Sequence, residues 1–279
     1  KITQKRKETE VGGLLFPNGV SIKTSKEDQD RILSVIVNAE RNGIDPAKIF
    51  TVSVMPCTAK KYEKDRAGQN ATGYSDVDAV ITTREIASMI KEANIDFVNL
   101  PDEDFDEILG TSSGAGVIFG ATGGVMEAAL RTVADVLTGK DLENIEFTDV
   151  RGISGIKEAT VKIGDLDVNV AIASGTGNAK KLLETIKAGE KNYHFIEIMA
   201  CPGGCVNGGG QPIVSARIKN VLDPRVVRAK GLYDEDNDKP VRKSHKNPDI
   251  HLLYKEYLGE PNGHKAHELL HTFYEKKEK

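Results

Sequence analysis

Short apolar runs alternate with amphipathic stretches along the chain, and this alternation predicts strands and helices in turn. We expect strands at residues 50–55, 79–82 and 195–199, where apolar side chains cluster or alternate over a few positions. Two further apolar runs on either side of Gly164-Asp165 predict a hairpin. Strands that alternate with helices favour an α/β architecture.

Capping residues mark where several predicted helices begin and end. Ser25 opens a predicted helix that stops at Asn42-Gly43, and Thr82 with Glu85 forms a capping box for a helix that runs to about residue 93. A glycine-rich turn within 114–131 leads into a helix that stops at residue 139, and a further helix is expected at 178–189.

The character of the chain changes after Gly208-Gly209-Gly210. The remaining stretch is polar and helical, and Asp223-Pro224 and Asn247-Pro248 combine an N-cap residue with a proline at the first helical position. These signals predict a helical C-terminal segment.

Composition narrows the class of protein. The chain is 39% hydrophobic with a mean hydropathy of −0.36, and no apolar run approaches the length of a membrane span. Residues 1–10 are charged and lack the apolar region of a secretory leader, so we expect no membrane segment and a cytoplasmic location. A net charge of −4 gives no electrostatic reason to expect a nucleic-acid partner.

The chain has three cysteines, and they follow predicted strand ends. Cys57 comes just after the strand at 50–55, and Cys201 and Cys205 come after the strand at 195–199. Ligand sites gather where strands end in α/β folds. An odd number of cysteines argues against a disulfide framework and indicates a reducing compartment, where thiols bind metal or stay free.

The spacing Cys201-x-x-x-Cys205 suits two thiolates that share one inorganic core. Gly203 and Gly204 can adopt backbone angles that bring amides close to the sulfurs, as iron-sulfur sites require. Free buried thiols are the alternative. Zinc is a poorer match, because there is no paired CxxC and His194 lies at the far end of the strand.

Three side chains near the cysteines are candidates for the same site. Lys60 follows Cys57 by three residues and could be buried beside an anionic cofactor, or could belong to a solvated turn. Met55 and Met199 each precede a cysteine by two residues, and either core packing or a cofactor wall would suit them.

Two other motifs give weaker evidence for a functional site. The glycine-rich stretch 114–131 lacks the Gly-Lys-Ser/Thr of a nucleotide-binding P-loop and the spacing of a dinucleotide fingerprint. Residues 267–271 read His-Glu-Leu-Leu-His, which matches a zinc-peptidase motif. His264 lies only one turn upstream on nearly the same helix face, where it could not complete a tetrahedral site well.

Taken together, these segments resemble the catalytic domain of iron-only (FeFe) hydrogenases. The second motif of that family matches MPCTAKK at 55–61, and the third matches residues 197–205 followed by GGGQP at 208–212. Residues 76–78, 82–85 and 119–129 also match. The SHKNP stretch at 244–248 and HELLHTFY at 267–274 resemble the small subunit of two-chain members, which explains the apparent zinc motif as family framework.

The resemblance implies a fold and a cofactor. It implies two lobes, each with a small mixed sheet flanked by helices, a cofactor in the cleft between them and a helical C-terminal belt. The lobes are expected at 1–120 and 121–215, with the small-subunit-like segment at 216–279. The implied cofactor is an H-cluster: a 4Fe-4S cubane joined to a two-iron subcluster that carries CO, cyanide and a bridging dithiolate.

The resemblance also implies roles for the site residues. Cys57, Cys201 and Cys205 would be cubane ligands, with Cys205 as the bridge to the two irons and Gly204 beside it. Lys60 would contact a cyanide, while Met55, Met199 and Phe119 would line the two-iron pocket. The implied activity is the reversible reduction of protons to H2, with an electron carrier such as ferredoxin or an iron-sulfur subunit as partner.

One family motif is absent from the sequence. The first motif, Thr-Ser-Cys-Cys-Pro, supplies the fourth cubane cysteine and a proton-relay cysteine, and gap-free counting places it around Lys5-Arg6, with Ser25 on a serine of the proton path. A non-catalytic or sensory paralogue, or an iron-sulfur assembly protein, is therefore the alternative to an active hydrogenase.

Overall fold

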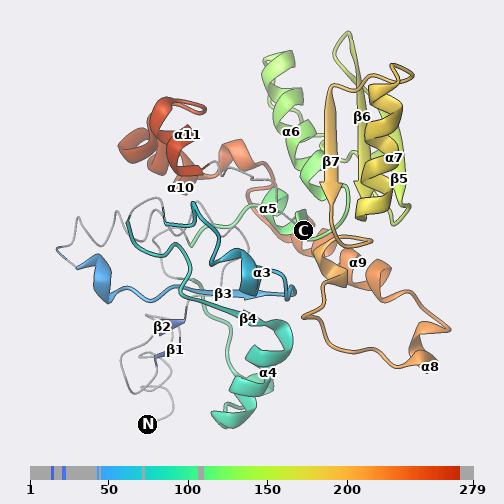
Figure 1. Cartoon of the computed structure of the whole chain (residues 1–279). Helices are drawn as coiled ribbons and strands as arrows, with labels where there is room; N and C mark the ends of the chain where they lie inside the picture. Colours follow the sequence, from blue (N-terminus) through green and yellow to red (C-terminus); the bar gives the residue numbers. More distant parts are fainter. Residues whose placement is uncertain are drawn as a thin grey trace. The chain divides into compact units, whose positions relative to one another are not determined.

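The computed structural model describes residues 14–15, 21–22, 43, 45–70, 73–105 and 110–270 (Figure 1). The helix expected from Ser25, the region around Lys5-Arg6 and the end of the His-Glu-Leu-Leu-His motif lie outside these residues. The chain divides into two compact units. Unit 1 comprises residues 1–111 with 248–279, and unit 2 comprises residues 112–247.

Unit 1 contains the strand that leads to Cys57. Strands β3 (Val52–Met55) and β4 (Ala79–Thr82) pair in parallel, with Met55 opposite Thr82. Both predicted strands are confirmed. The other described elements of its first part are β1 (Leu14–Leu15), β2 (Ser21–Ile22), η1 (Pro46–Lys48), α3 (Lys60–Glu63), α4 (Thr83–Glu92) and η2 (Phe97–Asn99).

The start of α4 is the predicted capping box. The Thr82 hydroxyl accepts a hydrogen bond from the Glu85 amide at 3.2 Å, and the Glu85 carboxylate accepts one from the Thr82 amide at 2.7 Å. Two helix-end donors are thereby satisfied by two side chains, so the helix starts directly where β4 ends.

The C-terminal part of unit 1 is helical, as predicted. It comprises α10 (Pro248–Leu253), η6 (Tyr254–Leu258) and α11 (His264–Leu270), which pack around Leu253, Leu258 and Ala266. The Asp249 carboxylate accepts a hydrogen bond from the Thr111 amide at 3.0 Å and so ties α10 to the end of the first segment.

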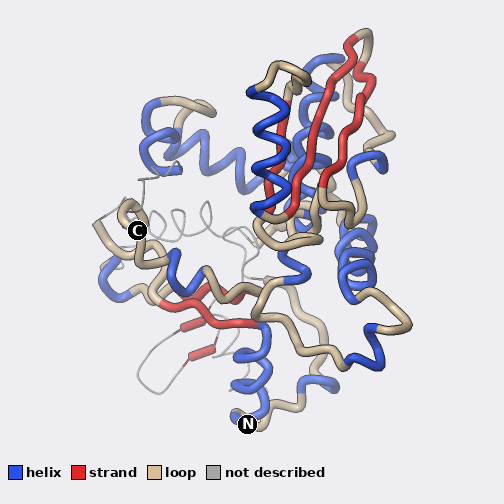
Figure 2. The backbone as a smooth tube through the Cα atoms, turned by 45° about the vertical axis from the view of Figure 1, so that its right-hand side comes forward, coloured by secondary structure: helices blue, strands red, loops and turns tan. Residues whose placement is uncertain are grey.

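Unit 2 is built on a three-stranded sheet with the order β5-β6-β7. Strands β5 (Ile156–Ile163) and β6 (Leu166–Ser174) form the predicted antiparallel hairpin around Gly164-Asp165, and β7 (Phe195–Met199) pairs in parallel with β6. Helices α6 (Gly124–Thr138) and α7 (Thr176–Lys187) cover opposite faces of the sheet (Figures 1 and 2).

The side-chain alternation of β6 explains why both faces are covered. Val170 and Ile172 are fully buried and pack with Met126 and Leu130 of α6, whereas Ala171 and Ala173 are fully buried with Leu182 of α7. The continuous apolar run at 170–173 in the second half of β6 suits a strand that is buried on both faces.

The glycine-rich stretch holds two helices, where the sequence predicted a turn and one helix. A short helix, α5 (Gly114–Ile118), precedes the turn, and α6 follows it. Gly123 has φ of +91°, and a Cβ there would lie 2.0 Å from the Val150 carbonyl oxygen. Glycine at position 123 therefore lets the start of α6 lie directly against the backbone of Val150.

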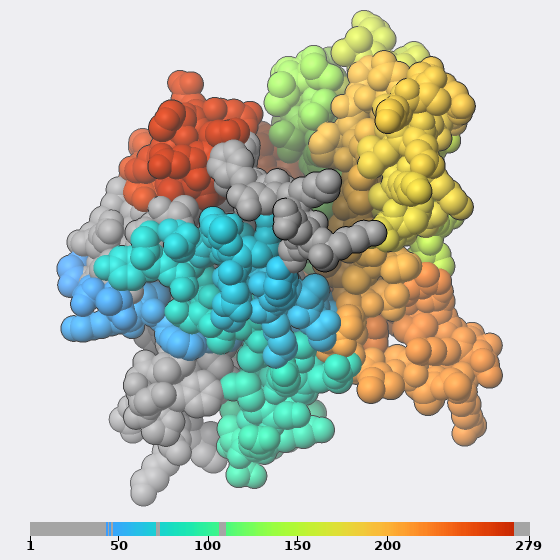
Figure 3. All heavy atoms as spheres, viewed as in Figure 1, coloured from blue at the N-terminus to red at the C-terminus, as the bar shows by residue number. Residues whose placement is uncertain are grey.

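After β7 the chain continues through η4 (Cys205–Asn207), α8 (Ala216–Lys219), α9 (Pro224–Asp238) and η5 (Ser244–Lys246). The predicted N-cap is confirmed, because the Asp223 carboxylate accepts a hydrogen bond from the Arg225 amide at 2.9 Å. The stretch around α8 projects from unit 2, and Ile213 and Val221 in it are 87% and 81% exposed (Figure 3).

Buried ion pairs fasten α9 to α6. The Arg131 side chain is fully buried and donates two hydrogen bonds to the Asp236 carboxylate, at 2.7 and 2.8 Å, and one to Glu127 at 2.8 Å. Two more reach the carbonyl oxygens of Ile145 and Arg242. Every N–H of the guanidinium is thus satisfied, which offsets its desolvation.

A second buried pair joins α6 to the segment that follows α9. The Lys243 ammonium lies 2.7 Å from the Asp135 carboxylate, and His245 Nε2 lies 2.9 Å from the same group. Burial alone would raise the pKa of Asp135, but the hydrogen bonds from Lys243, the Leu142 amide and His245 lower it to about 2. The carboxylate is therefore ionised at neutral pH.

The architecture is mixed α/β, with small sheets flanked by helices, as the sequence predicted. The contact-based units end at 111 and 247, while the predicted lobe boundaries at 120 and 215 stay a prediction. Among the described residues, no helix has the length and apolar character needed to cross a membrane.

We expect Arg131→Met to destabilise unit 2 strongly, because it leaves Asp236 and Glu127 buried with fewer cationic partners. The expected loss is about 3–5 kcal/mol in the free energy of unfolding, measured by denaturant titration. Lys180→Met is the control, because Lys180 pairs with Glu184 in an exposed contact worth about 0.5 kcal/mol. Equal effects of the two substitutions would contradict this account.

Candidate functional site

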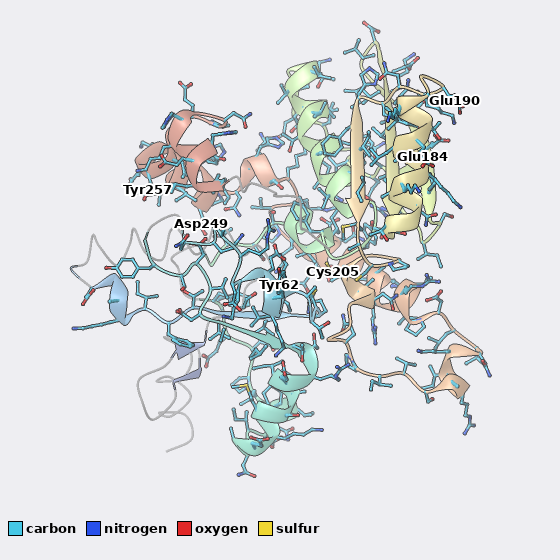
Figure 4. The ribbon with its side chains drawn as sticks, viewed as in Figure 1. Tyr62, Glu184, Glu190, Cys205, Asp249 and Tyr257 are labelled. Atoms are coloured by element: carbon cyan, nitrogen blue, oxygen red, sulfur yellow. The ribbon has the colours of Figure 1, made fainter. Side chains whose placement is uncertain are left out.

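The candidate site in unit 2 is the loop that follows β7. Gly203 and Gly204 have φ of +89° and +95°, and the Gly204 amide donates to the Cys201 carbonyl oxygen at 2.9 Å. This tight turn places Cys201 and Cys205 on one short loop beyond the end of β7. Cys205 is labelled in Figure 4. Both cysteines are half-buried and neither forms a disulfide.

The cysteine loop, residues 199–206, lies directly on the glycine loop, residues 119–124. The Thr122 amide donates to the Gly203 carbonyl oxygen at 3.1 Å, and the Val206 amide donates to the Gly120 carbonyl oxygen at 3.0 Å. A Cβ on Gly204 would lie 2.7 Å from both the Gly120 oxygen and the Thr122 nitrogen. Only glycine fits at position 204, because backbone occupies the space of a side chain.

Glu197 links the same two loops from within β7. Glu197 is 5% exposed, and its carboxylate accepts hydrogen bonds from the amides of Gly123 at 2.6 Å and Met126 at 2.7 Å. Burial raises the pKa of Glu197, while these backbone bonds and the nearby charge of Lys157 oppose that shift. The sequence contained Glu197 within a family motif but gave no reason to assign it a role.

Two of the predicted pocket residues flank these loops. Met199 is the last residue of β7, opposite Ser174 of β6, and is half-buried. Phe119 ends α5 at the start of the glycine loop and is 38% exposed. Unit 2 therefore brings together Phe119, Met199, Gly204 and the two cysteines Cys201 and Cys205.

Unit 1 holds the other predicted site residues. Met55 ends β3, Cys57 is half-buried two residues later, and Lys60 begins α3. The Lys60 ammonium lies 2.9 Å from Glu63, and its side chain is 39% exposed. These three residues share one strand-to-helix connection, and their roles toward a cofactor stay a prediction.

The chemistry of the donor set fits an iron-sulfur group. Thiolates are the ligands that such clusters take, and the glycine-built turn allows backbone amides to approach the sulfurs. The Thr122 hydroxyl is buried in the glycine loop and has no hydrogen-bond partner among the described residues. The same residues include no group of three or more His, Cys, Asp or Glu side chains placed to hold a single metal ion.

Two family models match consecutive parts of the chain. Residues 26–209 match the iron only hydrogenase large subunit, C-terminal domain. The chain belongs to the iron-only hydrogenase family. Residues 222–277 match the iron hydrogenase small subunit, so α9, which carries Asp236, belongs to the small-subunit-like part.

Individual relatives agree with this family. The chain is 47% identical to the NADP-reducing hydrogenase subunit HndD of Solidesulfovibrio fructosivorans over 267 residues, which cover 95% of this chain and 45% of HndD. It is 51% identical to iron hydrogenase 1 of Clostridium pasteurianum, with coverage of 84% and 41%. It is 30% identical to Protein NAR1 of Arabidopsis thaliana, with coverage of 96% and 58%.

A solved structure supports the fold. The [FeFe]-hydrogenase HydA1 of Chlamydomonas reinhardtii, in a variant form, matches with a TM-score of 0.69 and 40% identity over 89% of this chain and 68% of that chain. The curated relatives are longer, and this iron-only hydrogenase chain spans about half of their length.

We expect Gly204→Ala to separate the cysteine loop from the glycine loop, because the added Cβ meets backbone atoms at 2.7 Å and the φ of +95° disfavours any side chain. The expected loss of stability is at least about 2 kcal/mol, measured by thermal unfolding, together with reduced iron uptake. Gly177→Ala is the control, because a Cβ at position 177 meets nothing within 4 Å. Normal stability and iron uptake in Gly204→Ala would contradict the assignment.

Proposed function

We propose that this chain is the H-cluster domain of an iron-only hydrogenase and catalyses the reversible reduction of protons, 2H⁺ + 2e⁻ ⇌ H2. The observation that supports it most is the cysteine loop seated on the glycine loop, in a chain that matches the large-subunit model over 26–209. Because the chain spans about half of its curated relatives, this activity is proposed for the domain.

The proposed cofactor is a 4Fe-4S cubane joined to a two-iron subcluster with CO, cyanide and a bridging dithiolate. When bound, it supplies the redox and proton-reducing chemistry, which belongs to the organometallic group. Cys57, Cys201 and Cys205 would hold the cubane, and Cys205 would bridge to the two irons.

The chain's own residues would position and shield that group. The turn at Gly203 and Gly204 fixes Cys201 and Cys205 relative to each other. Phe119 and Met199 would offer apolar surface to the bound group and exclude water from it. Exclusion of water strengthens the electrostatic interactions inside a site. The Lys60 ammonium would supply a positive charge and hydrogen-bond donors to a cyanide.

The fourth cubane ligand has no cysteine in this sequence. The three cysteines account for three thiolates, and the position where the first family motif would fall, around Lys5-Arg6, lies outside the described residues. A cubane held by three cysteines leaves one iron to water or another ligand, which makes a cluster labile. In this chain the proposal therefore gives the fourth iron water or another non-cysteine ligand.

The proposed partner is an electron carrier such as ferredoxin or an iron-sulfur subunit. HndD is by name a subunit of an NADP-reducing hydrogenase, and residues 222–277 match a small subunit. Redox subunits exchange electrons through transient contacts of modest area. A cytoplasmic location remains part of this proposal.

An iron-sulfur assembly protein is the second candidate function. NAR1 matches along 96% of the chain, and other relatives are named cytosolic iron-sulfur assembly components. The higher identity to hydrogenases, 47% and 51% against 30%, favours the hydrogenase. Lys60, Met55 and Met199 favour it too, because the family resemblance gives these positions to the two-iron pocket.

Anaerobic reconstitution tests the proposed function. The chain is loaded with iron and sulfide, then with a synthetic two-iron complex, and examined by infrared spectroscopy and by hydrogen evolution from reduced viologen. The proposal predicts CO and cyanide bands together with hydrogen evolution. Absence of both would contradict it, and a cluster without those bands that binds iron-sulfur client proteins would support the assembly function.

We expect Lys60→Met to weaken retention of the two-iron complex about tenfold or more, because a charge-assisted hydrogen bond is lost. Retention is measured by the intensity of the CO and cyanide bands after gel filtration. Lys61→Met is the matched control, because Lys61 pairs with Glu85 at 2.8 Å in an exposed contact. Equal retention of the two-iron complex in the two variants would contradict the proposed contact between Lys60 and a cyanide.

A further inference from the structure

We infer that Glu197 is a positioning residue that holds the glycine loop in register with the cysteine loop, and thereby sets where Cys201 and Cys205 stand relative to Phe119. This inference rests on the proposed function for its consequence, because it matters to a cofactor held between these loops. The attachment itself belongs to unit 2 alone.

Glu197 reaches across from the sheet to the start of a helix. One carboxylate oxygen accepts from the Gly123 amide at 2.6 Å and the other from the Met126 amide at 2.7 Å. Both amides belong to the first turn of α6 or the residue before it, where helix N–H groups have no partner within the helix. The carboxylate satisfies two of these donors and faces the positive end of the helix dipole.

Burial raises the pKa of Glu197, and the hydrogen bonds from the Gly123 and Met126 amides and the charge of Lys157 oppose that shift. The side chain is 5% exposed, which would ordinarily favour the neutral acid. Lys157 is the cation whose charge acts on Glu197, and its ammonium donates a hydrogen bond to the Val150 carbonyl oxygen. Burial lowers the pKa of Lys157 to about 8, and the negative charges of Glu197 and Glu127 act in the opposite direction. A buried carboxyl group held by one amide donor on each oxygen is a rigid anchor.

The position of Glu197 in the chain makes that anchor act on the site. Only Ile198, Met199 and Ala200 separate it from Cys201, and Gly123 is in the glycine loop that starts at Phe119. The two backbone hydrogen bonds between the loops, Thr122 to Gly203 and Val206 to Gly120, lie farther along the same contact. Glu197 thus fixes the contact between the two loops on the side of Gly123, while the Val206 to Gly120 hydrogen bond lies next to Cys205.

The test compares Glu197→Gln with Asp135→Asn in the full chain. The glutamine side chain keeps the shape of glutamate but turns an N–H₂ group toward an amide donor and removes the charge. Asp135 is a matched control, because it is a buried carboxylate on α6, the helix that Glu197 contacts, and its partners are Lys243, His245 and the Leu142 amide. Glu197→Asp, one methylene shorter, keeps the carboxylate and gives an intermediate variant.

Hydrogen exchange of the cluster-free chain is the first measurement. We expect amide exchange in 119–126 and 199–206 to rise about tenfold in Glu197→Gln, equivalent to about 1.4 kcal/mol, with a smaller rise in Glu197→Asp. Asp135→Asn should leave these two segments at the wild-type rate. Unchanged exchange in Glu197→Gln, or an equal rise in Asp135→Asn, would overturn the inference.

The second measurement tests whether the contact that Glu197 makes between the loops affects the bound cluster. Each variant is reconstituted with the iron-sulfur cluster, and its electron paramagnetic resonance spectrum and reduction potential are compared at matched iron content. We expect both to change in Glu197→Gln and to match the wild type in Asp135→Asn. Faster exchange with an unchanged spectrum and potential would reduce Glu197 to a structural role and overturn the inference. Failure of every variant and the wild type to bind a cluster would contradict the proposed function. The exchange result would still show whether Glu197 holds the two loops together.

Discussion

The site depends on one close contact between two segments of backbone. Gly204, in the cysteine loop, lies against Gly120, Ala121 and Thr122 of the glycine loop at a distance that leaves no room for a Cβ. This contact determines where the two cysteines of unit 2 stand, because the turn at Gly203 and Gly204 and the hydrogen bonds on each side of it all follow from it. Glycine is required at position 204 because a side chain would clash with the backbone of the glycine loop, and the close contact in turn positions the cysteines.

The rest of unit 2 keeps that contact in place. The glycine loop joins α5 to α6, and α6 is held from one side by the sheet and from the other by α9 through Arg131 and Asp236. Since α9 lies in the part that matches a small subunit and α6 in the part that matches a large subunit, these buried ion pairs join the two family modules within one chain. Such pairs give little net stability over apolar packing, but breaking one partner is costly, so they specify a single arrangement.

Local features of the fold could be predicted from the sequence, whereas long-range pairings could not. The capping box at Thr82, the N-cap at Asp223, the hairpin at Gly164-Asp165 and the strand that ends at Met199 all follow from residues close together in the chain. Arg131 and Asp236 are 105 residues apart, and each looks in isolation like an ordinary exposed charge on a helix. Only the packed structure reveals that both are fully buried.

The same distinction applies to the site. The spacing of Cys201 and Cys205 with two glycines between them was sufficient to predict a shared turn, because the needed backbone angles are local. The role of Glu197 was not predictable, since its partners, Gly123 and Met126, are more than 70 residues away in the chain and are backbone amides, which leave no signal in a sequence. The short helix α5 was missed because the glycines within it are poor helix formers and indicated a turn.

The central claim is that the cysteines hold an H-cluster, and identifying the bound cluster tests it most directly. Mössbauer spectroscopy of the chain, reconstituted anaerobically with ⁵⁷Fe and sulfide and then with the synthetic two-iron complex, distinguishes the possible iron environments. The account predicts a sulfur-ligated 4Fe-4S signal that requires Cys201 and Cys205, joined after the second step by a distinct signal from low-spin iron bound to CO and cyanide. Iron that stays unbound to these cysteines, or a cluster that never accepts the two-iron complex, would contradict it.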